Sequence, residues 1–181
     1  ITSGTFLKGL IHIGRETFPA GRIGERASLG LSDALINYGI KLGRLKTGTP
    51  PRLDRFSIDW DKTKIAEGDV SPSCFSLFTK RPFSINQENC YVVNTNRDVH
   101  TLIHNNLHSS AMFSGKISGV GPRYCPSIED KVFRFKERDS HHLFLEPEWS
   151  NSKQIYVNGF STSLSREVQL AALKKIEAFK N

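Results

Sequence analysis

The sequence predicts a protein of the α/β or α+β class. Patterns typical of strands and of amphipathic helices alternate along the 181 residues, and no segment is repeated. Hydrophobic residues make up 38% of the chain and charged residues 24%, a composition typical of a folded domain with a buried core. No run of 18 apolar residues occurs, so the sequence offers no candidate for a membrane-spanning helix.

The beginning of the chain is rich in glycine and predicts short extended segments. Residues 1–5 and 10–13 carry β-branched and apolar side chains around small residues, which is typical of short strands. The first residues, ITSGTFL, contain neither an initiator Met nor the pattern of a signal peptide. We therefore expect the chain to begin inside a domain.

A helix and a basic strand are expected next. Leu and Ile recur at helical spacing over residues 27–38, and Gly39 is a suitable C-terminal cap. Residues 41–54 then alternate basic and other side chains, which favours a strand that Pro50-Pro51 would end.

The remaining elements follow from hydrophobic periodicity. Short apolar alternations predict strands at residues 90–95, 116–120, 141–145 and 155–157. Apolar residues at helical spacing predict helices over residues 97–107 and 166–179.

The segment GPRYCPSIEDKVFRF, residues 121–135, is the most informative in the chain. Ser127 followed by Asp130 predicts a capping box at the start of a helix. The apolar residues of that helix recur at i, i+4 and i+7 and predict one buried face, formed by Ile128, Val132 and Phe135.

This helix start gives one thiol a distinctive setting. Cys125 lies just before the helix, with Arg123 and Lys131 near it in sequence. Such a setting favours a reactive thiol and attracts anions. The alternative is a capped surface helix that carries a half-buried cysteine.

Charge and cysteine content narrow the function classes. The net charge of +7 fits binding to nucleic acid or to a phosphate-bearing cofactor, although solubility alone is an alternative explanation. Cys74, Cys90 and Cys125 are an odd number, widely spaced and in no CxxC arrangement, which indicates a reducing compartment and argues against a disulfide framework or a zinc ribbon.

Two segments contain groups suited to anions. Residues 119–123, GVGPR, place two glycines and an arginine before the helix and suggest a phosphate site. In an extended segment, Arg44, Lys46 and Arg52 would project to one side and contact an anionic ligand or an RNA backbone. A solvated strand face is the alternative for the second segment.

Two histidine clusters give weaker indications. His100, His104 and His108 fit one helical face, where two imidazoles can bind zinc, but no carboxylate ligand follows, so solvated histidines are the alternative. Glu146 and Glu148 follow His141 and His142, an arrangement suited either to acid–base chemistry or simply to charges at a strand end.

With these residues laid out, the chain resembles the MnmG (GidA) family of flavoproteins, which modify the wobble uridine of certain tRNAs. The resemblance runs from end to end and is strongest in GRLKTGTPPRLD and GVGPRYCPSIEDKVFRF. The other segments that carry it are SGTFLKGLIHIG, AGRIGE, NNLHSS-x-MFSG, HHLFLEPE and NGFSTSLS.

The resemblance implies a fold and a reaction. Residues 1–55 would be part of a Rossmann-type FAD-binding domain, and residues 56–181 an inserted α/β domain with a mixed sheet that binds NADH. The chain would be a central piece, incomplete at both ends and inactive alone. The full-length protein would be a homodimer that acts on tRNA without membrane contact. With a GTPase partner of the MnmE type, which docks on a missing helical domain, it would add an aminomethyl-type group to C5 of uridine 34. A folate would supply the one-carbon unit, and reduced FAD would transfer electrons.

The resemblance also implies site residues. FAD contacts map onto Ser3, Gly4, Thr5 and Ser28. The NAD-binding stretch maps onto Gly121, Pro122, Arg123, Tyr124, Cys125, Pro126, Ser127, Ile128, Glu129, Asp130, Lys131, Val132, Phe133, Arg134 and Phe135. Cys125 matches a motif cysteine with a nucleophilic or redox role, and no metal is implied. Contacts with tRNA or dinucleotide phosphates map onto Arg22, Lys46, Arg52, Arg123 and Lys131.

Three positions depart from the family pattern. Trp149 stands where a glycine is usual, and Val157 and Ser165 stand where prolines are common. A divergence rich in Lys, Asn and Ser suggests a mitochondrial member, with the bacterial cytoplasm as the alternative.

Two functions of other kinds also fit the sequence. One is a non-catalytic RNA-binding module that keeps only the basic surface. The other is an NAD(P)H-dependent flavin oxidoreductase acting on a small molecule or a disulfide, for which no second cysteine lies near Cys125 in sequence.

Overall fold

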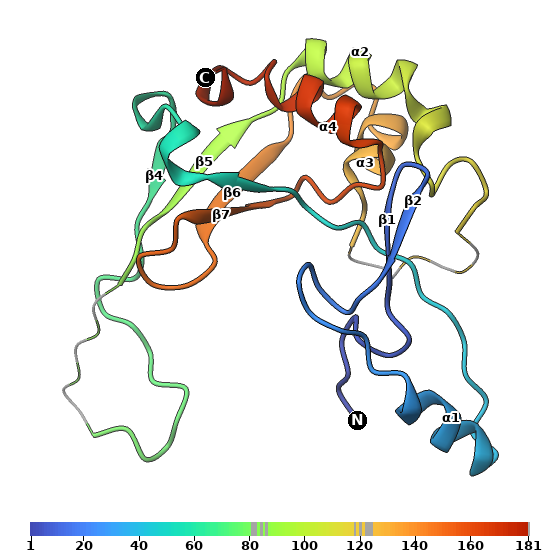
Figure 1. The fold of residues 1–181 in the computed structure, drawn as a ribbon. Helices are drawn as coiled ribbons and strands as arrows, with labels where there is room; N and C mark the ends of the chain where they lie inside the picture. Colours follow the sequence, from blue (N-terminus) through green and yellow to red (C-terminus); the bar gives the residue numbers. More distant parts are fainter. Residues whose placement is uncertain are drawn as a thin grey trace.

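A five-stranded antiparallel sheet lies at the centre of the molecule (Figure 1). The computed structural model describes residues 1–80, 83, 85, 87–117, 119, 121 and 125–180. The strands, in the spatial order β3-β7-β6-β5-β4, are β3 (Arg52–Asp54), β4 (Lys64–Ala66), β5 (Cys90–Asn94), β6 (His142–Pro147) and β7 (Gln154–Asn158). The α/β class is confirmed, but all of these pairings are antiparallel and not mixed.

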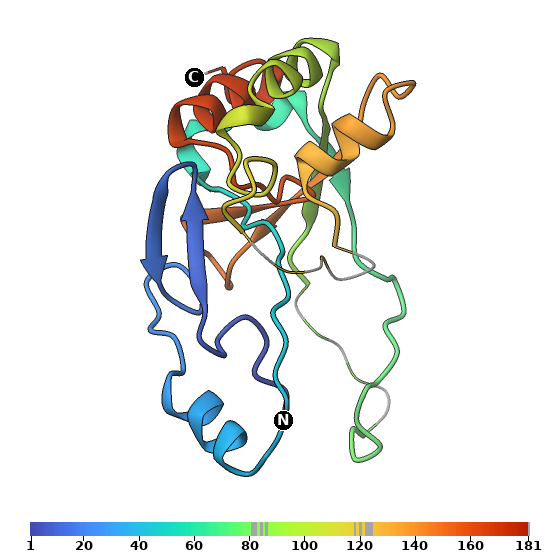
Figure 2. The ribbon, with the colours of Figure 1, turned by 90° about the vertical axis from the view of Figure 1, so that its right-hand side faces the viewer.

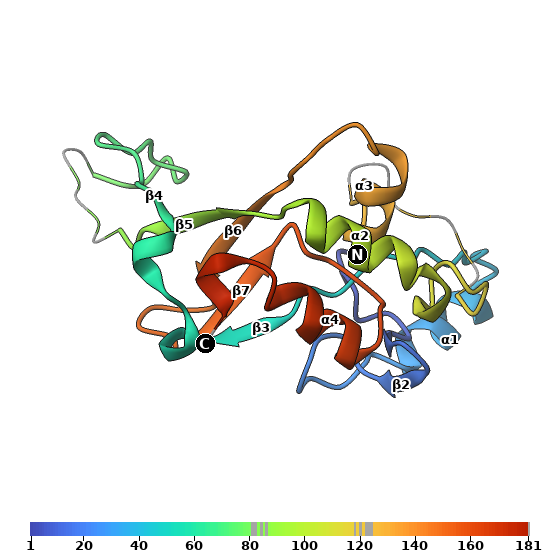
Figure 3. The same cartoon turned by 90° about the horizontal axis from the view of Figure 1, so that it is seen from above.

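Three helices cover one face of this sheet (Figures 1 and 3). They are α2 (Arg97–Asn105), α3 (Ile128–Arg134) and α4 (Arg166–Leu173). Alternate residues of β6 and β7 point toward them and are fully buried: Leu143, Leu145, Ile155 and Val157. The helices contribute the opposite side of the core: Val99, Ile103, Ile128, Val132, Ala172 and Leu173. Short 3-10 helices complete the connections, at Arg55–Ser57, Trp60–Lys62, Leu107–Ser109 and Glu177–Phe179.

The N-terminal residues form a hairpin and a separate helix (Figure 2). Strands β1 (Leu10–Ile13) and β2 (Glu16–Pro19) pair antiparallel, and α1 (Gly30–Asn37) lies at the far end of this part. The turn of the hairpin reaches the beginning of α4, where the Gly14 N–H donates to the Ser163 carbonyl at 3.0 Å. A side chain at Gly14 would stand 2.8 Å from Ser165, so this approach requires glycine.

Helix positions were predicted better than helix lengths. The helices expected over residues 27–38, 97–107 and 166–179 are confirmed in place, as α1, α2 and α4. Each is shorter than predicted: α1 begins only at Gly30, whereas α2 and α4 end before the last apolar residues of their patterns. After α4, for example, Ile176 is extended, and its side chain is still buried in the core. Among the described residues, no helix combines the length and the apolar character that crossing a bilayer requires.

The strands expected at residues 90–95, 141–145 and 155–157 are confirmed as β5, β6 and β7. Two other strand predictions were wrong. Residues 1–5 form a turn with Gly4 in the left-handed region (φ +54°). Most of residues 41–54 is irregular, and β3 begins only after Pro51, because a proline has no N–H to offer a neighbouring strand. Residues 116, 117 and 119 form no strand, and Ser118 and Val120 of that prediction lie outside the described residues.

Candidate active site

The start of α3 forms as the sequence predicts. The Ser127 hydroxyl accepts a hydrogen bond from the Asp130 N–H at 3.1 Å, and the Asp130 carboxylate accepts one from the Ser127 N–H at 3.2 Å. This capping box satisfies two N–H groups that have no partner within the helix. Ile128 and Val132 are buried as expected, whereas Phe135 follows the last helical residue and is 41% exposed.

The stretch predicted to bind NAD, residues 121–135, is divided between the surface and the interior. Ser127, Ile128, Glu129 and Val132 are buried, and Asp130 and Lys131 are half-buried. The exposed members are Gly121, Cys125, Pro126, Phe133, Arg134 and Phe135. Pro122, Arg123 and Tyr124 lie outside the described residues. Among the described residues of this stretch, the side chains open to a ligand are therefore those of the loop, of Lys131 and of the exposed Phe133, Arg134 and Phe135.

Two segments far apart in sequence meet at the exposed thiol. The hydroxyl Oγ1 of Thr47 lies 2.7 Å from Sγ of Cys125, across 78 residues of sequence. Thr47 is half-buried, and Cys125 is exposed. The basic segment of residues 43–52 thus contacts the loop before α3, which no local pattern could have shown.

Lys131 lies beside this contact. Its ammonium donates to the Gly159 carbonyl at 2.9 Å, which fixes the side chain against the end of β7. Burial lowers the pKa of Lys131, while the neighbouring Cys125 thiolate acts in the opposite direction. An ammonium that is partly desolvated beside a thiol is suited to holding a negative charge there.

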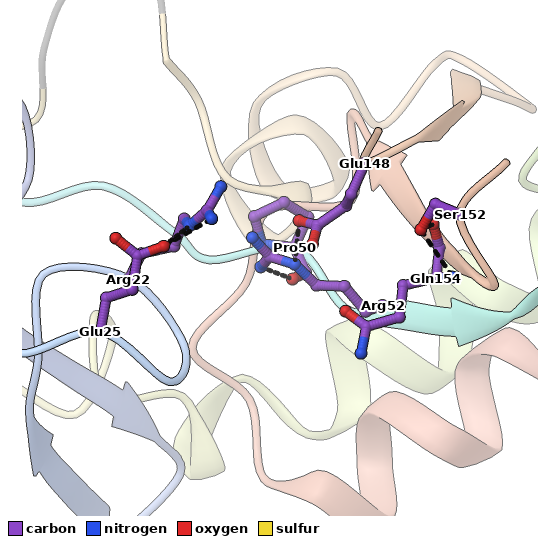
Figure 4. Close-up of polar contacts among 7 residues, drawn as sticks. All are labelled: Arg22, Glu25, Pro50, Arg52, Glu148, Ser152 and Gln154. Carbon is purple, nitrogen blue, oxygen red and sulfur yellow. Dashed lines mark hydrogen bonds and ion pairs between the residues drawn. The ribbon is translucent and has the colours of Figure 1, made fainter. Parts of the chain in front are cut away.

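Arg52 and Glu148 form a largely buried ion pair (Figure 4). Nε of Arg52 lies 2.9 Å from Oε1 of Glu148, and Nη1 donates to the Pro50 carbonyl at 3.0 Å. The guanidinium also lies over the ring of Tyr156, 4.8 Å from its centroid. The Arg52 charge is therefore already paired within the protein.

The phenol of Tyr156 is influenced by the charges of both Arg52 and Cys125. Its pKa is raised mainly by burial, and the charges of Glu146, Cys125 and Glu148 act in the same direction, against Arg52. The phenol therefore stays protonated over the physiological range and has an O–H to donate.

The other two basic residues predicted to contact phosphates differ in whether their charge is already paired within the protein. Arg22 is exposed and pairs with Glu25 across a tight turn (Figure 4). Lys46 is half-buried and forms no ion pair among the described residues.

The predicted flavin contacts come together at the N-terminal part. Ser28 pairs in parallel with Leu7, and its N–H donates to the Phe6 carbonyl at 2.8 Å. The Ser3–Thr5 turn immediately precedes this bridge, with the Thr5 hydroxyl donating to the Gly21 carbonyl at 2.7 Å. The two predicted segments are therefore neighbours, although more than twenty positions separate them in sequence.

The histidine clusters serve structural contacts. Nε2 of His100 lies 2.7 Å from the Thr95 hydroxyl, and its ring stacks on that of His141 with centroids 5.0 Å apart. His104 and His108 are exposed, and within the described residues no three potential ligands are grouped to hold a metal ion.

The acid–base alternative receives no support from the side-chain contacts. Glu148 pairs with Arg52, and Glu146 accepts a hydrogen bond from Asn158 at 2.9 Å. His142 contacts Asn94, and His141 is buried under α2 and α3. The two carboxylates therefore have partners other than the histidines.

Two residues of this region differ from what the sequence suggests. Thr47 was passed over in favour of its basic neighbours, although its hydroxyl makes the contact with Cys125. Glu129 was placed among the ligand contacts, but its side chain is fully buried. A glutamate one position before the capping-box aspartate gave no signal of burial.

The family model described as "Glucose inhibited division protein A" matches residues 1–181. The MnmG of Syntrophotalea carbinolica, named a tRNA uridine 5-carboxymethylaminomethyl modification enzyme, is 52% identical over 97% of this chain and 28% of its own length. The protein of the same name from Protochlamydia amoebophila is 49% identical over all of this chain and 29% of its own.

A solved structure shows the same fold. The GidA of Aquifex aeolicus superposes with a TM-score of 0.83 and 44% identity over 99% of this chain and 31% of that one. The chain thus spans less than a third of the length of these relatives. All three come from bacteria, so the mitochondrial prediction has no support. A match over every residue, at this identity, shows that the chain belongs to the family of glucose inhibited division protein A.

Proposed function

We propose that the chain is the central part of an FAD-dependent enzyme that modifies uridine in tRNA. Relatives that match nearly the whole chain carry the name of such an enzyme. The observation that carries the proposal is the contact between Thr47 and Cys125. Each residue belongs to one of the two sequence segments that are most typical of the family. Such segments are expected to meet where they serve one reaction.

The proposed reaction belongs to the full-length protein, and the fragment alone is inactive. With a GTPase partner of the MnmE type, the enzyme adds an aminomethyl-type group to C5 of wobble uridine 34, and a folate supplies the carbon. FAD, when bound, supplies the electron transfer. Cys125 presents an exposed thiol for nucleophilic or redox assistance, beside the ammonium of Lys131.

The N-terminal residues fit a flavin. Gly4 has no other atom within 4 Å of the place where a side chain would stand, so its backbone is open to a ligand. Ser3, Thr5 and Ser28 bring hydroxyl groups to the same region. We assign this part to the FAD-binding domain. Because β3 pairs with β7, a boundary near Thr49 fits better than one after residue 55.

NADH is proposed to contact the loop before α3. The exposed Gly121, Cys125 and Pro126 and the ammonium of Lys131 are available there, and Arg123 is the predicted partner of the phosphates. The test is NADH affinity of the full-length protein with Arg123 and Lys131 changed to Ala. An unchanged affinity would remove both residues from the site.

The proposed partners and location follow from the family. The basic side chains of Arg22, Lys46 and Lys131 are the candidates for tRNA contacts, and Arg52 is the least available because of its ion pair. We propose a homodimer in the bacterial cytoplasm, in line with the bacterial origin of the relatives.

The test of the whole proposal uses the full-length protein. We expect the purified protein to be yellow with bound flavin and, with its GTPase partner, to introduce the modification into tRNA, read by mass spectrometry of the nucleosides. Cys125→Ser should keep the flavin and lose the modification. Cys90→Ser is the matched control, because Cys90 lies in β5, away from Thr47, and this variant should keep both.

Other outcomes would favour the two rival functions. A colourless protein that binds tRNA tightly indicates a non-catalytic RNA-binding module. A yellow protein that oxidises NADH without modifying tRNA indicates an oxidoreductase acting on a smaller substrate.

A further inference from the structure

The side chain of Glu129 has no role in the function proposed above, yet it is fully buried in the first turn of α3. A buried carboxylate is costly unless hydrogen bonds compensate for the loss of water. The hydrogen-bond donors around the Glu129 carboxylate therefore indicate its role. A direct contact with a dinucleotide would require an exposed carboxylate, which this residue does not offer.

One oxygen of Glu129 gathers donors from two distant segments. Oε1 accepts hydrogen bonds from the Ser163 N–H at 3.0 Å and from the Ser110 hydroxyl at 2.9 Å. The two serine hydroxyls lie 2.9 Å apart, and that of Ser163 also accepts the Met112 N–H at 3.1 Å. The Ser163 hydroxyl also lies 3.4 Å from Oε1 of Glu129. Oε2 of Glu129 has no partner among the described residues.

The segment Ser161–Ser163 connects this carboxylate to the helix start. The Ser161 carbonyl accepts the N–H of Ile128 at 2.7 Å, and the Ser163 N–H donates to Glu129. Two successive residues of α3 are thus held to the same short segment. Because Cys125 lies three residues before Ile128, these bonds fix the place from which its loop departs.

The same segment holds the residue that faces the thiol. Thr49 and Thr162 exchange two backbone hydrogen bonds, of 3.2 and 3.3 Å. A side chain on Gly48 would stand only 2.5 Å from the backbone nitrogen of Thr162, so the two backbones are in close contact. Thr47 directly precedes Gly48 in the sequence. Glu129 thus bonds to Ser163, the neighbouring Thr162 pairs with Thr49, and Thr47 contacts Cys125, which precedes Glu129 in the sequence. These contacts lead from the helix start back to the loop before it.

We propose that Glu129 is a positioning residue that fixes Cys125 against Thr47 by fastening the start of α3 to the segment Ser161–Ser163. The inference rests on the proposed function, in which Cys125 assists the reaction. Glu129 acts here as a hydrogen-bond acceptor. Gln at this position keeps a carbonyl oxygen for the same donors and places its amide where Oε2 has no described partner. Ala removes the acceptor and leaves the Ser163 N–H buried without a partner.

The experiment compares variants of the full-length protein by tRNA modification and by the rate at which iodoacetamide alkylates Cys125. For Glu129→Ala we expect kcat to fall by about tenfold or more, with KM for tRNA within about twofold, because the reacting groups are misplaced while the binding surface remains. Alkylation of Cys125 should accelerate several-fold, since its loop is released from Thr47. Glu129→Gln should restore both values to within about threefold of the parent.

A pair of serine variants covers the case in which Glu129→Ala does not fold. Ser110→Ala removes one donor to Glu129 and should accelerate alkylation of Cys125 to a smaller extent. Ser109→Ala is the matched control, because its hydroxyl donates to the Asn106 carbonyl and not to Glu129, and it should change nothing. Equal behaviour of these two variants, where Glu129→Ala does not fold, overturns the proposal.

Two further results would overturn it. An unchanged rate and unchanged alkylation in a folded Glu129→Ala protein would show that nothing is positioned. An equal loss in Glu129→Gln and Glu129→Ala would show that the charge itself is required. If the parent protein does not modify tRNA, the proposed function fails, and the alkylation series still decides the positioning role by itself.

Discussion

The guanidinium of Arg52 and the carboxylate of Glu148 form an ion pair across 96 residues of sequence, with Nε 2.9 Å from Oε1. Only 11% and 9% of the two side chains remain exposed. The pair joins β3 to the end of β6, beside the ring of Tyr156. This ion pair, which is largely shielded from water, therefore fastens the edge strand β3 to the sheet.

Replacing Arg52 with Ala should destabilise the full-length protein by about 3 kcal/mol, because the carboxylate of Glu148 is left without its partner. Urea denaturation followed by circular dichroism measures the effect. The matched control is Arg97→Ala, which breaks an ion pair with Asp139 that is 79% and 65% exposed. Its cost should stay below about 1 kcal/mol. Equal costs for the two changes would contradict the structural role given to Arg52.

Lys46 and Arg52 should differ in their effect on tRNA binding. Lys46→Ala should weaken binding and reduce the slope of log affinity against log salt by about 0.7–0.9, the value of one phosphate contact. Arg52→Ala should leave that slope unchanged, because its charge is already paired. Lys174→Ala, an exposed basic residue after α4, is the control and should change neither quantity. If Arg52→Ala reduced the salt slope more than Lys46→Ala, Arg52 and not Lys46 would be the residue that contacts a phosphate.

His141 should make the fold sensitive to mild acid. Burial lowers the pKa of His141 to about 4, and the positive charges of His100, Lys131 and Arg138 act in the same direction. Well above pH 6.5 the imidazole is neutral in both the folded and the unfolded state. As the pH falls toward 4, the unfolded chain takes up the proton first, so stability is lost. Between pH 7.5 and 5 the loss should be about 2 kcal/mol.

His141→Phe should remove this part of the pH dependence, measured by urea denaturation at pH 7.5 and pH 5. The variant keeps a ring against His100 and cannot titrate. His104→Gln, at an exposed position of α2, is the control and should follow the parent. If the variant loses as much stability in acid as the parent, another group is responsible.

Gly159 should not tolerate a side chain. Its φ is +94°, and a Cβ would stand 2.9 Å from the His142 carbonyl oxygen. Gly159→Ala should therefore cost about 2 kcal/mol or more in stability and also disturb the carbonyl that holds Lys131. Gly39→Ala separates the two causes, because its φ is +77° but its surroundings are open. Thermal unfolding of both variants gives the comparison, and a smaller loss at Gly159 would argue against the clash.

The features predicted correctly from the sequence are those that depend on residues close together in the chain. The capping box of Ser127 and Asp130 formed as expected, because its partners lie three residues apart. The strands β5, β6 and β7 also formed where apolar alternation placed them. The strand expected over residues 41–54 was largely wrong, because the segment forms an isolated bridge between Thr49 and Thr162, and not a continuous strand, before β3 begins after Pro51.

The site itself depended on contacts between distant segments. Thr47 and Cys125 are 78 residues apart, and Arg52 and Glu148 are 96 apart. No periodicity or spacing relates such pairs. The burial of Glu129 was hidden for a similar reason, because an acidic residue in a first helical turn usually faces water, and here the donors of Ser110 and Ser163 replace it. Only the family resemblance singled out the two segments that contain Thr47 and Cys125, which meet in the structure.

The short segment Ser161–Ser163 forms backbone hydrogen bonds with residues of four different segments: Gly14, Thr49, Ala111 and Ile128. One added or deleted residue there would move every one of these partners out of alignment at once. The connection after β4, by contrast, runs through residues 67–80 with its large apolar side chains in solvent. Natural relatives should therefore vary in length in that outer connection, whereas the stretch from Ser161 to Ser163 should keep a constant length across evolution.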